Sequence, residues 1–167
     1  IGAGVGIVGL GKKLADEAIQ WNTQVRTMQR LTGATAEQVS SLMAVADYMG
    51  ESPETSTVSF AKFSKALAGA RDSMQSAAEQ GSASSDAFSK LGLTLNDIQG
   101  KNTVEVFQLI QDRLRGMKDG AEKTRIEMEL FGKSGYQLNG MLNMSAEAMK
   151  QVEDRARTMG LVIDDEA

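Results

Sequence analysis

The sequence predicts an all-α fold, in which several amphipathic helices separated by glycines form a helical bundle or an extended helical array. Apolar residues recur at the 3.6-residue spacing of a helix along most of the 167 residues. Helix-start signals precede these stripes and glycines follow them. Because the glycines interrupt the heptad rhythm, the pattern favours several packed helices over one long coiled coil. The predicted breaks are Gly33, Gly50, Gly81, Gly92, Gly100 and Gly132.

Residues 12–80 are predicted to form the N-terminal helices. Thr35 and Gln38 have the spacing of a capping box, which marks the start of the second helix. Ser52 before Pro53 marks the start of the third, since proline is favoured at the first helical position. The apolar stripes expected to face the core are Leu14, Ala18, Trp21, Val25 and Met28, then Val39, Leu42, Ala46 and Met49, then Phe60, Phe63, Leu67, Ala70, Met74 and Ala77.

Residues 81–85 (GSASS) are predicted to be linker-like because glycine and serine dominate them. Residues 86–167 are predicted to form a helical core. Two short helices in it should end at Gly92 and Gly100, and Thr103 should cap a longer one.

A further helix is expected after Gly120. Lys123 with Glu127 and Arg125 with Glu129 are i,i+4 pairs of opposite charge, expected on its solvent side. The apolar stripes expected in this half of the chain are Phe107, Ile110, Leu114 and Met117, then Ala121, Thr124, Met128 and Phe131, then Met149, Val152, Ala156 and Met159.

The chain opens on IGAGVGIVGLG, residues 1–11, which carry no charge. Gly4, Gly6 and Gly9 have the spacing of a dinucleotide-binding loop, but that loop needs a preceding strand and a βαβ unit, and the sequence predicts neither. The segment is also shorter than the roughly 20 residues of a membrane-spanning helix. We predict that it is the end of a longer apolar segment, or a small-residue helix face that lets helices pack closely.

The composition excludes several kinds of functional site. Without Cys, the chain has neither disulfides nor Cys-based metal sites, and without His it lacks the commonest general base. A net charge of -4 with interspersed acids and bases gives no electrostatic footprint for nucleic acid. We therefore predict no catalytic residue, no cofactor, no metal site and no specific nucleic-acid partner.

Three short matches to functional motifs lack the context that those motifs need. Ser59 and Lys62 have Ser-x-x-Lys spacing, without the other elements of penicillin-recognising enzymes. Asn143 opens an Asn-Met-Ser glycosylation sequon, without a secretory signal. A run of bases interrupted by acids is predicted to be solvated helix surface, with DNA contact as the minor alternative. These bases are Arg113, Arg115, Lys118, Lys123 and Arg125.

The most informative stretch is Leu130-Phe131-Gly132-Lys133-Ser134-Gly135, which we predict to be a helix-turn-helix corner. Phe131 should be the last apolar residue of a helix, Gly132 should end that helix in a left-handed conformation, and Ser134 should cap the next helix. Gly132-Lys133-Ser134 also matches the end of a phosphate-binding loop. That loop needs a glycine where this chain has Glu127, whose carboxylate would repel a phosphate.

With its flanking segments, this corner resembles the core of phage tail tape-measure proteins. The order and spacing of the similar segments match from about residue 20 to the end of the chain. Two departures are the absence of the proline that often follows the family's corner, here at Gly140-Met141-Leu142, and a longer, more polar stretch around Pro53. The similar segments are LTGATAEQ (31–38), FSKLGL (88–93), MKDGAEKT (117–124), the corner itself and ARTMGLVID (156–164).

The resemblance implies a structural protein that is not an enzyme. A tape-measure protein is made in the host cytoplasm, occupies the lumen of the tail tube, sets tail length during assembly and leaves ahead of the DNA. The implied partners are other copies of the chain in a homo-oligomer, tail-tube and tail-tip proteins, tail assembly chaperones and, on ejection, the host membrane. As one continuous helix the chain would reach only about 250 Å, so a full ruler needs more chain than these residues.

Two alternatives from other classes stay open at this point. One is a helical adaptor of a secretion or signalling system, which would have the same amphipathic stripes. The other is a cell-wall hydrolase module, which the absence of His and Cys and of a recognisable carboxylate pair disfavours.

Overall fold

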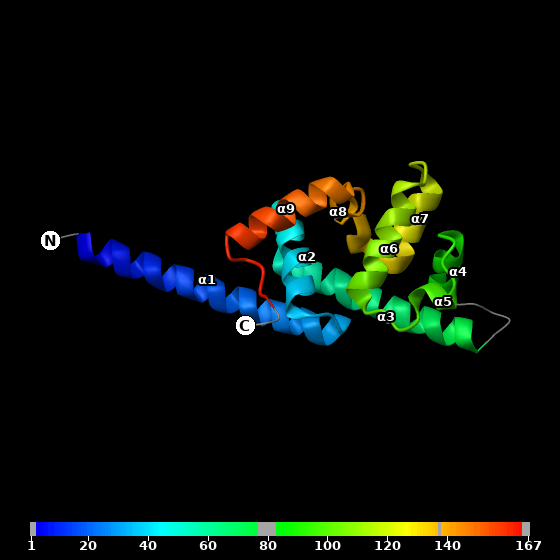
Figure 1. Ribbon diagram of the computed structural model, residues 1–167, viewed down its shortest axis with the longest axis horizontal. Coiled ribbons are helices and arrows are strands. Elements are labelled where there is room, and N and C mark those ends of the chain that lie inside the picture. Colours follow the sequence, from blue (N-terminus) through cyan, green and yellow to red (C-terminus); the bar gives the residue numbers. More distant parts are fainter. Residues whose placement is uncertain (1–2, 77–82, 137, 165–167) are drawn as a thin grey trace.

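Figure 1 shows a computed structural model of the chain, in which a bundle of helices carries one long projecting helix. The structure describes residues 3–76, 83–136 and 138–164, without the side chains of residues 3–15, Ser134 and Tyr136. These described residues form helices and turns and no strand, which confirms the all-α prediction. The helices are α1 (Ala3–Thr32), α2 (Ala36–Tyr48), α3 (Pro53–Gln75), α4 (Ala83–Lys90), α5 (Leu95–Ile98), α6 (Thr103–Arg115), α7 (Ala121–Phe131), the 3-10 helix η1 (Gly132–Tyr136), α8 (Asn139–Leu142) and α9 (Ala146–Thr158).

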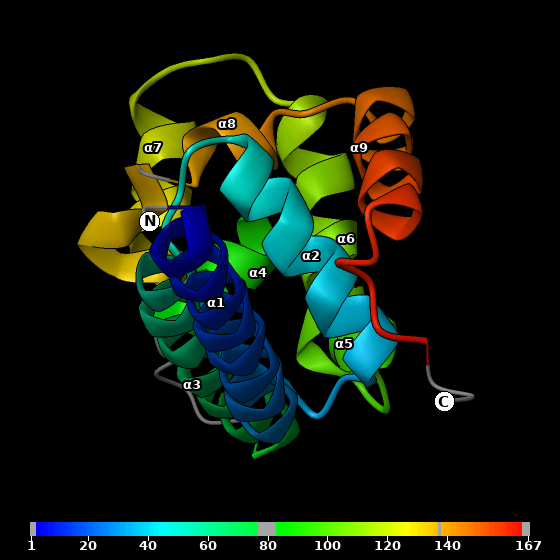
Figure 2. The same ribbon diagram turned by 90° about the vertical axis from the view of Figure 1, so that its left-hand side faces the viewer.

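The projecting helix is α1, which runs without interruption for 30 residues. The boundary predicted after residues 1–11 therefore falls inside a helix. Towards its C-terminal end, α1 packs on the bundle through Val25 and Met28, which are fully buried, and it runs beside α3 (Figure 2). Residues 16–20 are exposed, including Ala18, which was predicted to face the core.

Side-chain caps set the starts of α2 and α3 as predicted. Thr35 Oγ1 accepts a hydrogen bond from Gln38 N, and Gln38 Oε1 accepts one from Thr35 N, both at 3.2 Å. Ser52 Oγ accepts one from Thr55 N at 3.2 Å, and Pro53 occupies the first position of α3.

The predicted cap of α6 was wrong by one residue. Asn102, not Thr103, is the N-cap, because its side chain forms a reciprocal capping box with Glu105. Asparagine is at least as good a cap as threonine, and Thr103 becomes the buried first residue of the helix. Asn102 Nδ2 also donates to Gln38 Oε1 at 2.9 Å, which joins the starts of α2 and α6.

Glycines with positive φ end the helices at the predicted breaks Gly33, Gly50, Gly92, Gly100 and Gly132. Gly81, also predicted as a break, lies outside the described residues. Of the linker-like residues 81–85, those from Ala83 onward belong to α4.

The centre of the core is a cluster of four phenylalanines from three helices. Phe60 and Phe63 come from α3, Phe107 from α6 and Phe131 from α7, and all four are fully buried. Ring centroids lie 5.0 Å apart for Phe60 and Phe107, 4.8 Å for Phe63 and Phe131 and 5.7 Å for Phe107 and Phe131. The predicted N-terminal helices and the predicted helical core therefore share one hydrophobic core.

The stripe predicted for α7 was wrong except at Phe131. Ile126 and Leu130 face the core beside it, because these two larger apolar side chains are also one turn apart and bury more surface. Met49 and Met159, predicted at the ends of two other stripes, are likewise exposed. The exposed residues of the predicted α7 stripe are Ala121, Thr124 and Met128.

The chain after α9 returns to the N-terminal helices. Trp21 Nε1 of α1 donates to Leu161 O at 3.0 Å, and Ile163 N donates to Ser40 Oγ of α2 at 2.9 Å. Arg157 pairs with Glu37 of α2 and, at 2.9 Å, with Asp164. These contacts hold residues 161–164 against α1 and α2.

Candidate functional site

The corner Leu130–Gly135 comprises the end of α7 and most of η1, and its first two residues anchor it in the core. Leu130 and Phe131 are fully buried. The N–H of Gly132 donates to Met128 O, and Gly132 has φ 71° and ψ -161°. The positive φ agrees with the prediction, but the ψ differs from that of a left-handed helix and belongs to a region that essentially only glycine occupies.

The start of the helix after the corner differs from the prediction. Ser134 was expected to cap it, but residues 132–136 form the 3-10 helix η1 and α8 begins only at Asn139. The N-cap of α8 is Leu138, without a side-chain cap hydrogen bond. The 3-10 helix satisfies local backbone groups by tightening the chain, so an immediate side-chain cap is not needed.

At two glycines of the corner, Gly132 and Gly135, atoms of other residues lie where a larger residue would have its Cβ. A Cβ at Gly135 would lie 2.7 Å from Glu127 O and 3.2 Å from Phe131 Cβ. A Cβ at Gly132 would lie 3.0 Å from Lys62 Cδ of α3. The sequence indicated a corner here, but not that η1 folds back onto the backbone of α7.

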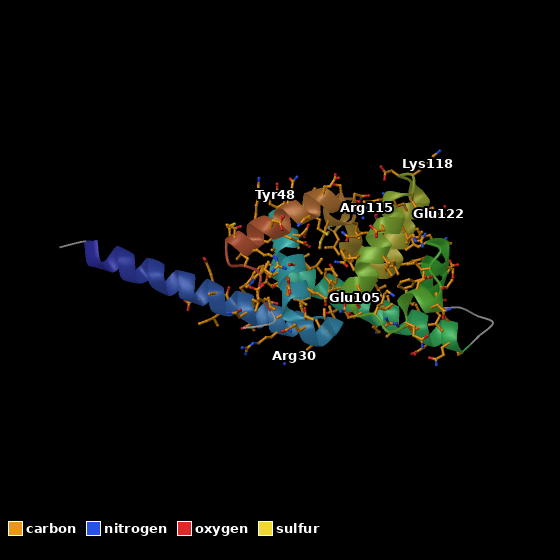
Figure 3. The ribbon with its side chains drawn as sticks, viewed as in Figure 1. Arg30, Tyr48, Glu105, Arg115, Lys118 and Glu122 are labelled. Atoms are coloured by element: carbon orange, nitrogen blue, oxygen red, sulfur yellow. The ribbon has the colours of Figure 1, made fainter. Side chains whose placement is uncertain are left out.

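This fold-back forms one wall of a cavity of about 280 Å³ that is open to solvent and lies between α7, the corner and α8. Lys123 lines this cavity, and its Nζ donates to Asn143 Oδ1 at 2.6 Å. Lys118 and Glu122 project from the bundle at the start of α7 (Figure 3), whereas Lys123 is only 5% exposed. The residues that line the cavity include Lys123, Thr124, Glu127, Met128, Lys133 and Asn139.

Among the residues that the structure describes, the two buried charged side chains, Lys123 and Glu127, both line this cavity. Glu127 is 6% exposed, and its Oε1 is buried without a hydrogen-bond partner. Burial raises the pKa of the Glu127 carboxyl above its ordinary value; the Lys123 ammonium opposes this shift and Asp119 reinforces it. Lys123 Nζ itself pairs with Asp119 Oδ1 at 2.9 Å.

The two predicted ion pairs of α7 therefore have different outcomes. Arg125 and Glu129 form the expected i,i+4 pair, at 2.8 Å. Lys123 and Glu127 do not lie on the solvent side, and the hydrogen bonds of Lys123 go to Asp119 and Asn143. The burial of this pair was not predicted, because the apolar stripe of α7 was assigned to the wrong face of the helix. The i,i+4 spacing of Ile126 and Leu130 indicated the face that is buried.

The structure does not form a phosphate-binding loop at Lys133. The corner follows helix α7, whereas such a loop follows a strand. Glu127 lines the same cavity as Lys133, so a phosphate bound beside Lys133 would lie near a carboxylate that repels it.

The residues of the other motif matches take part in packing, in hydrogen bonds within the fold or in a helix. Ser59 is fully buried, its Oγ has no hydrogen-bond partner, and Lys62 lies against Gly132. Asn143 of the sequon accepts from Lys123 Nζ and donates to Asn139 O, so its amide is engaged within the fold. The glycine-rich match at residues 4–9 lies in helical backbone from Ala3 onward, not in a strand-to-helix loop.

Of the five bases predicted as solvated surface, Arg113, Lys118 and Arg125 are exposed, whereas Arg115 is half-buried and Lys123 is buried. Arg115 donates to Met144 O at 2.7 Å and pairs with Asp112. Arg113 and Lys118 are exposed, and Arg125 and Lys123 pair with acids as described above. Their arrangement forms no continuous basic face along one helix.

Within the described residues, no group of three or more acidic, His or Cys side chains is placed to hold a metal ion. Among the helices of those same residues, none is long and apolar enough to cross a membrane. Comparisons of the chain with protein-family models, curated proteins and solved structures found no match.

Proposed function

We propose that this chain is a structural, non-enzymatic segment of a phage or phage-like tail tape-measure protein. The observation that carries the proposal is the ordered series of segments between Leu31 and Asp164 that resembles this family, with the Leu130–Gly135 corner at its centre. In this role the chain occupies the tail-tube lumen as a homo-oligomer. Its partners are tail-tube and tail-tip proteins and, before assembly, tail assembly chaperones, with host-membrane contact on ejection.

The use of the corner residues supports a structural role. Phe131 fills the aromatic cluster, and Gly135 admits the backbone of Glu127. Lys62 covers Gly132. Phe131, Gly132 and Gly135 carry no nucleophile or general base, and packing accounts for each of them, which favours the tail proposal over a hydrolase module.

The projecting helix supports a contribution to length. A helix adds about 1.5 Å per residue, and it adds this length without needing a core of its own. With 30 residues, α1 spans about 45 Å. An element of this kind lets a chain change its reach while the bundle beside it stays the same.

The test is an in-frame insertion into α1 of the full-length gene, in the particle that encodes it. An insertion of about 36 residues, or ten full helical turns, after residue 15 keeps the helix faces aligned and should lengthen tails by ~54 Å. Electron microscopy of purified tails measures the change. Deletion of α3 is a poorer test because Phe60 and Phe63 lie in the core.

A matched control is the same insertion placed in the loop between Arg115 and Ala121, where it lies outside the projecting helix. Tails of unaltered length from the α1 insertion would reject the ruler role and favour a tip-binding or channel-forming role within the same protein. If mass spectrometry finds no trace of the chain in purified tails, the helical adaptor becomes the better hypothesis.

A further inference from the structure

The cavity between α7, the corner and α8 is large enough for a small organic group. Its volume is about 280 Å³, and one water needs only about 10–15 Å³ on the same measure. The hydrogen bond between Lys123 Nζ and Asn143 Oδ1 ties α7 to the end of α8 and keeps the two walls together.

Glu127 contributes the unusual chemistry of this cavity. Its side chain is more than nine-tenths buried, and Oε1 accepts no hydrogen bond. A buried acceptor without a donor destabilises a fold by about 1–3 kcal/mol, and by more when the group is charged. A hydrogen-bond donor that reached this carboxylate from the cavity would therefore satisfy a buried acceptor.

The charges around Glu127 favour a donor that is positively charged. The nearest cation, Lys123, already pairs with Asp119 and Asn143. The Glu127 carboxylate therefore has the Lys123 charge nearby, which opposes the rise of its pKa by burial, but no hydrogen bond from Lys123. Lys133 of the corner also lines the cavity, so a ligand with a single compact cationic head is favoured over a polycation.

The solvent-facing wall of the cavity, formed by Thr124 and Met128, is apolar enough to contact an alkyl chain attached to that cationic head. Met128 lines the cavity and is 49% exposed, which is unusual for a large apolar side chain of a core helix. Thr124 lies one turn before Met128 and adds a methyl group to the same wall. An adaptable thioether beside a short aliphatic surface accommodates a flexible chain.

We propose that this cavity binds an alkylammonium group, with its N–H donors directed to the Glu127 carboxylate and its alkyl chain along Met128. The inference does not rest on the tail proposal. The same chemistry is offered by a small free amine and by the tip of a lysine side chain from a second copy of the chain. The experiment below separates these two sources.

The test is an NMR titration of the 167-residue chain with butylammonium chloride, following the backbone amides of residues 119–143. Butanol serves as the uncharged ligand and sodium chloride as the ionic-strength control, both at equal concentration. We expect saturable shifts with butylammonium only, in a millimolar range because so few ligand atoms make contact. Glu127→Gln should weaken binding at least about tenfold, since the uncharged amide has lost the acceptor charge.

Glu122→Gln is the matched control, because it removes the same charge from an exposed position of α7. It should leave the affinity unchanged, and Lys133→Ala should strengthen binding by removing a like charge. Sedimentation equilibrium distinguishes the sources: a monomer that binds butylammonium supports the free amine. An oligomer that dissociates on Glu127→Gln and on butylammonium addition supports the lysine tip.

Three results would overturn the proposal. The first is the absence of saturable binding by a monomeric chain. The second is binding that Glu127→Gln leaves unchanged while circular dichroism shows the variant folded. The third is binding that appears only in Lys133→Ala, which would mean that Lys133 itself occupies the position beside Glu127.

Discussion

The carbonyl oxygen of Glu127 lies directly against Gly135, so that a Cβ at residue 135 would stand 2.7 Å from it. No side chain can be accommodated at that distance from a backbone atom without movement of the chain. The approach brings η1 back onto α7 and forms one side of the cavity at the corner. The last glycine of the corner is thus required by contact with another element, whereas Gly132 is required by its own backbone angles.

Gly135→Ala should lower the free energy of unfolding. The added methyl group meets backbone on one side and Phe131 Cβ on the other, at 3.2 Å, and overpacking of this kind costs about 1–3 kcal/mol. Urea denaturation followed by far-UV circular dichroism measures the change. Gly69→Ala is the matched control in α3, where a Cβ meets nothing within 4 Å, and it should stabilise the chain by about 0.5–1 kcal/mol. Equal effects from the two variants would contradict the close approach at Gly135.

Phe131→Ala should be the most destabilising single truncation of the corner. Its ring contacts Phe63 and Phe107 and is fully buried, and such a truncation costs about 3–5 kcal/mol. Met128→Ala, on the exposed face of the same helix, should change stability by no more than about 0.5 kcal/mol. A small effect of Phe131→Ala in thermal melts would show that the corner is not anchored in the core.

Gly132→Ala should destabilise the chain through its backbone rather than through crowding. Its angles lie in a glycine-only region, and another residue there costs about 1–3 kcal/mol. Lys62 lies close to the new methyl group, but a flexible lysine tip can move aside. The loss should therefore persist when Gly132→Ala is combined with Lys62→Ala, after the effect of Lys62→Ala alone is subtracted. If the double variant recovered the full stability, the destabilisation by Gly132→Ala would come from crowding against Lys62 and not from the backbone.

Glu127→Gln should change how stability depends on pH. The pKa of Glu127 is raised in the folded chain from 4.5, chiefly by burial. An acid of this kind stabilises the fold fully below its unfolded pKa, and the contribution is lost as pH rises through the higher folded pKa. The amide avoids that loss, so the variant should be more stable than the parent by about 1 kcal/mol near neutral pH, with the advantage gone near pH ~4.

Urea titrations at both pH values measure this difference. Glu122→Gln removes the same charge from an exposed site of α7 and should show no such pH-dependent gain. A gain of the same size in both variants would mean that net charge, and not the buried carboxyl, sets the effect.

The local signals in the sequence were sufficient for most helix limits. Thr35, Ser52 and the breaking glycines act within a few residues of themselves, so a sequence pattern captures them. The cap of α6 was misplaced because Asn102 and Thr103 are adjacent and both are good capping residues. Only Glu105, three residues after Asn102, distinguishes the two.

The candidate site depended on long-range contacts, and the sequence showed less of it. Lys123 and Glu127 have the spacing of a surface ion pair, and their burial follows from the packing of α7 against the core and of α8 over its start. The bond from Lys123 to Asn143 spans 20 residues and depends on the fold-back at Gly135. No periodicity in the chain encodes that contact, whereas the corner itself was evident from its glycines.

The hydrogen bond from Trp21 to the carbonyl of Leu161 gives the molecule a built-in optical reporter. The chain has a single tryptophan, and its indole nitrogen meets a segment 140 residues away in sequence. Release of residues 161–164 from α1 would leave that indole facing water, with a red shift in its emission and no background from another tryptophan. Fluorescence therefore follows the attachment of the last segment to the first helix separately from loss of helical content, and shows whether the two ends of the fold open before the phenylalanine cluster does.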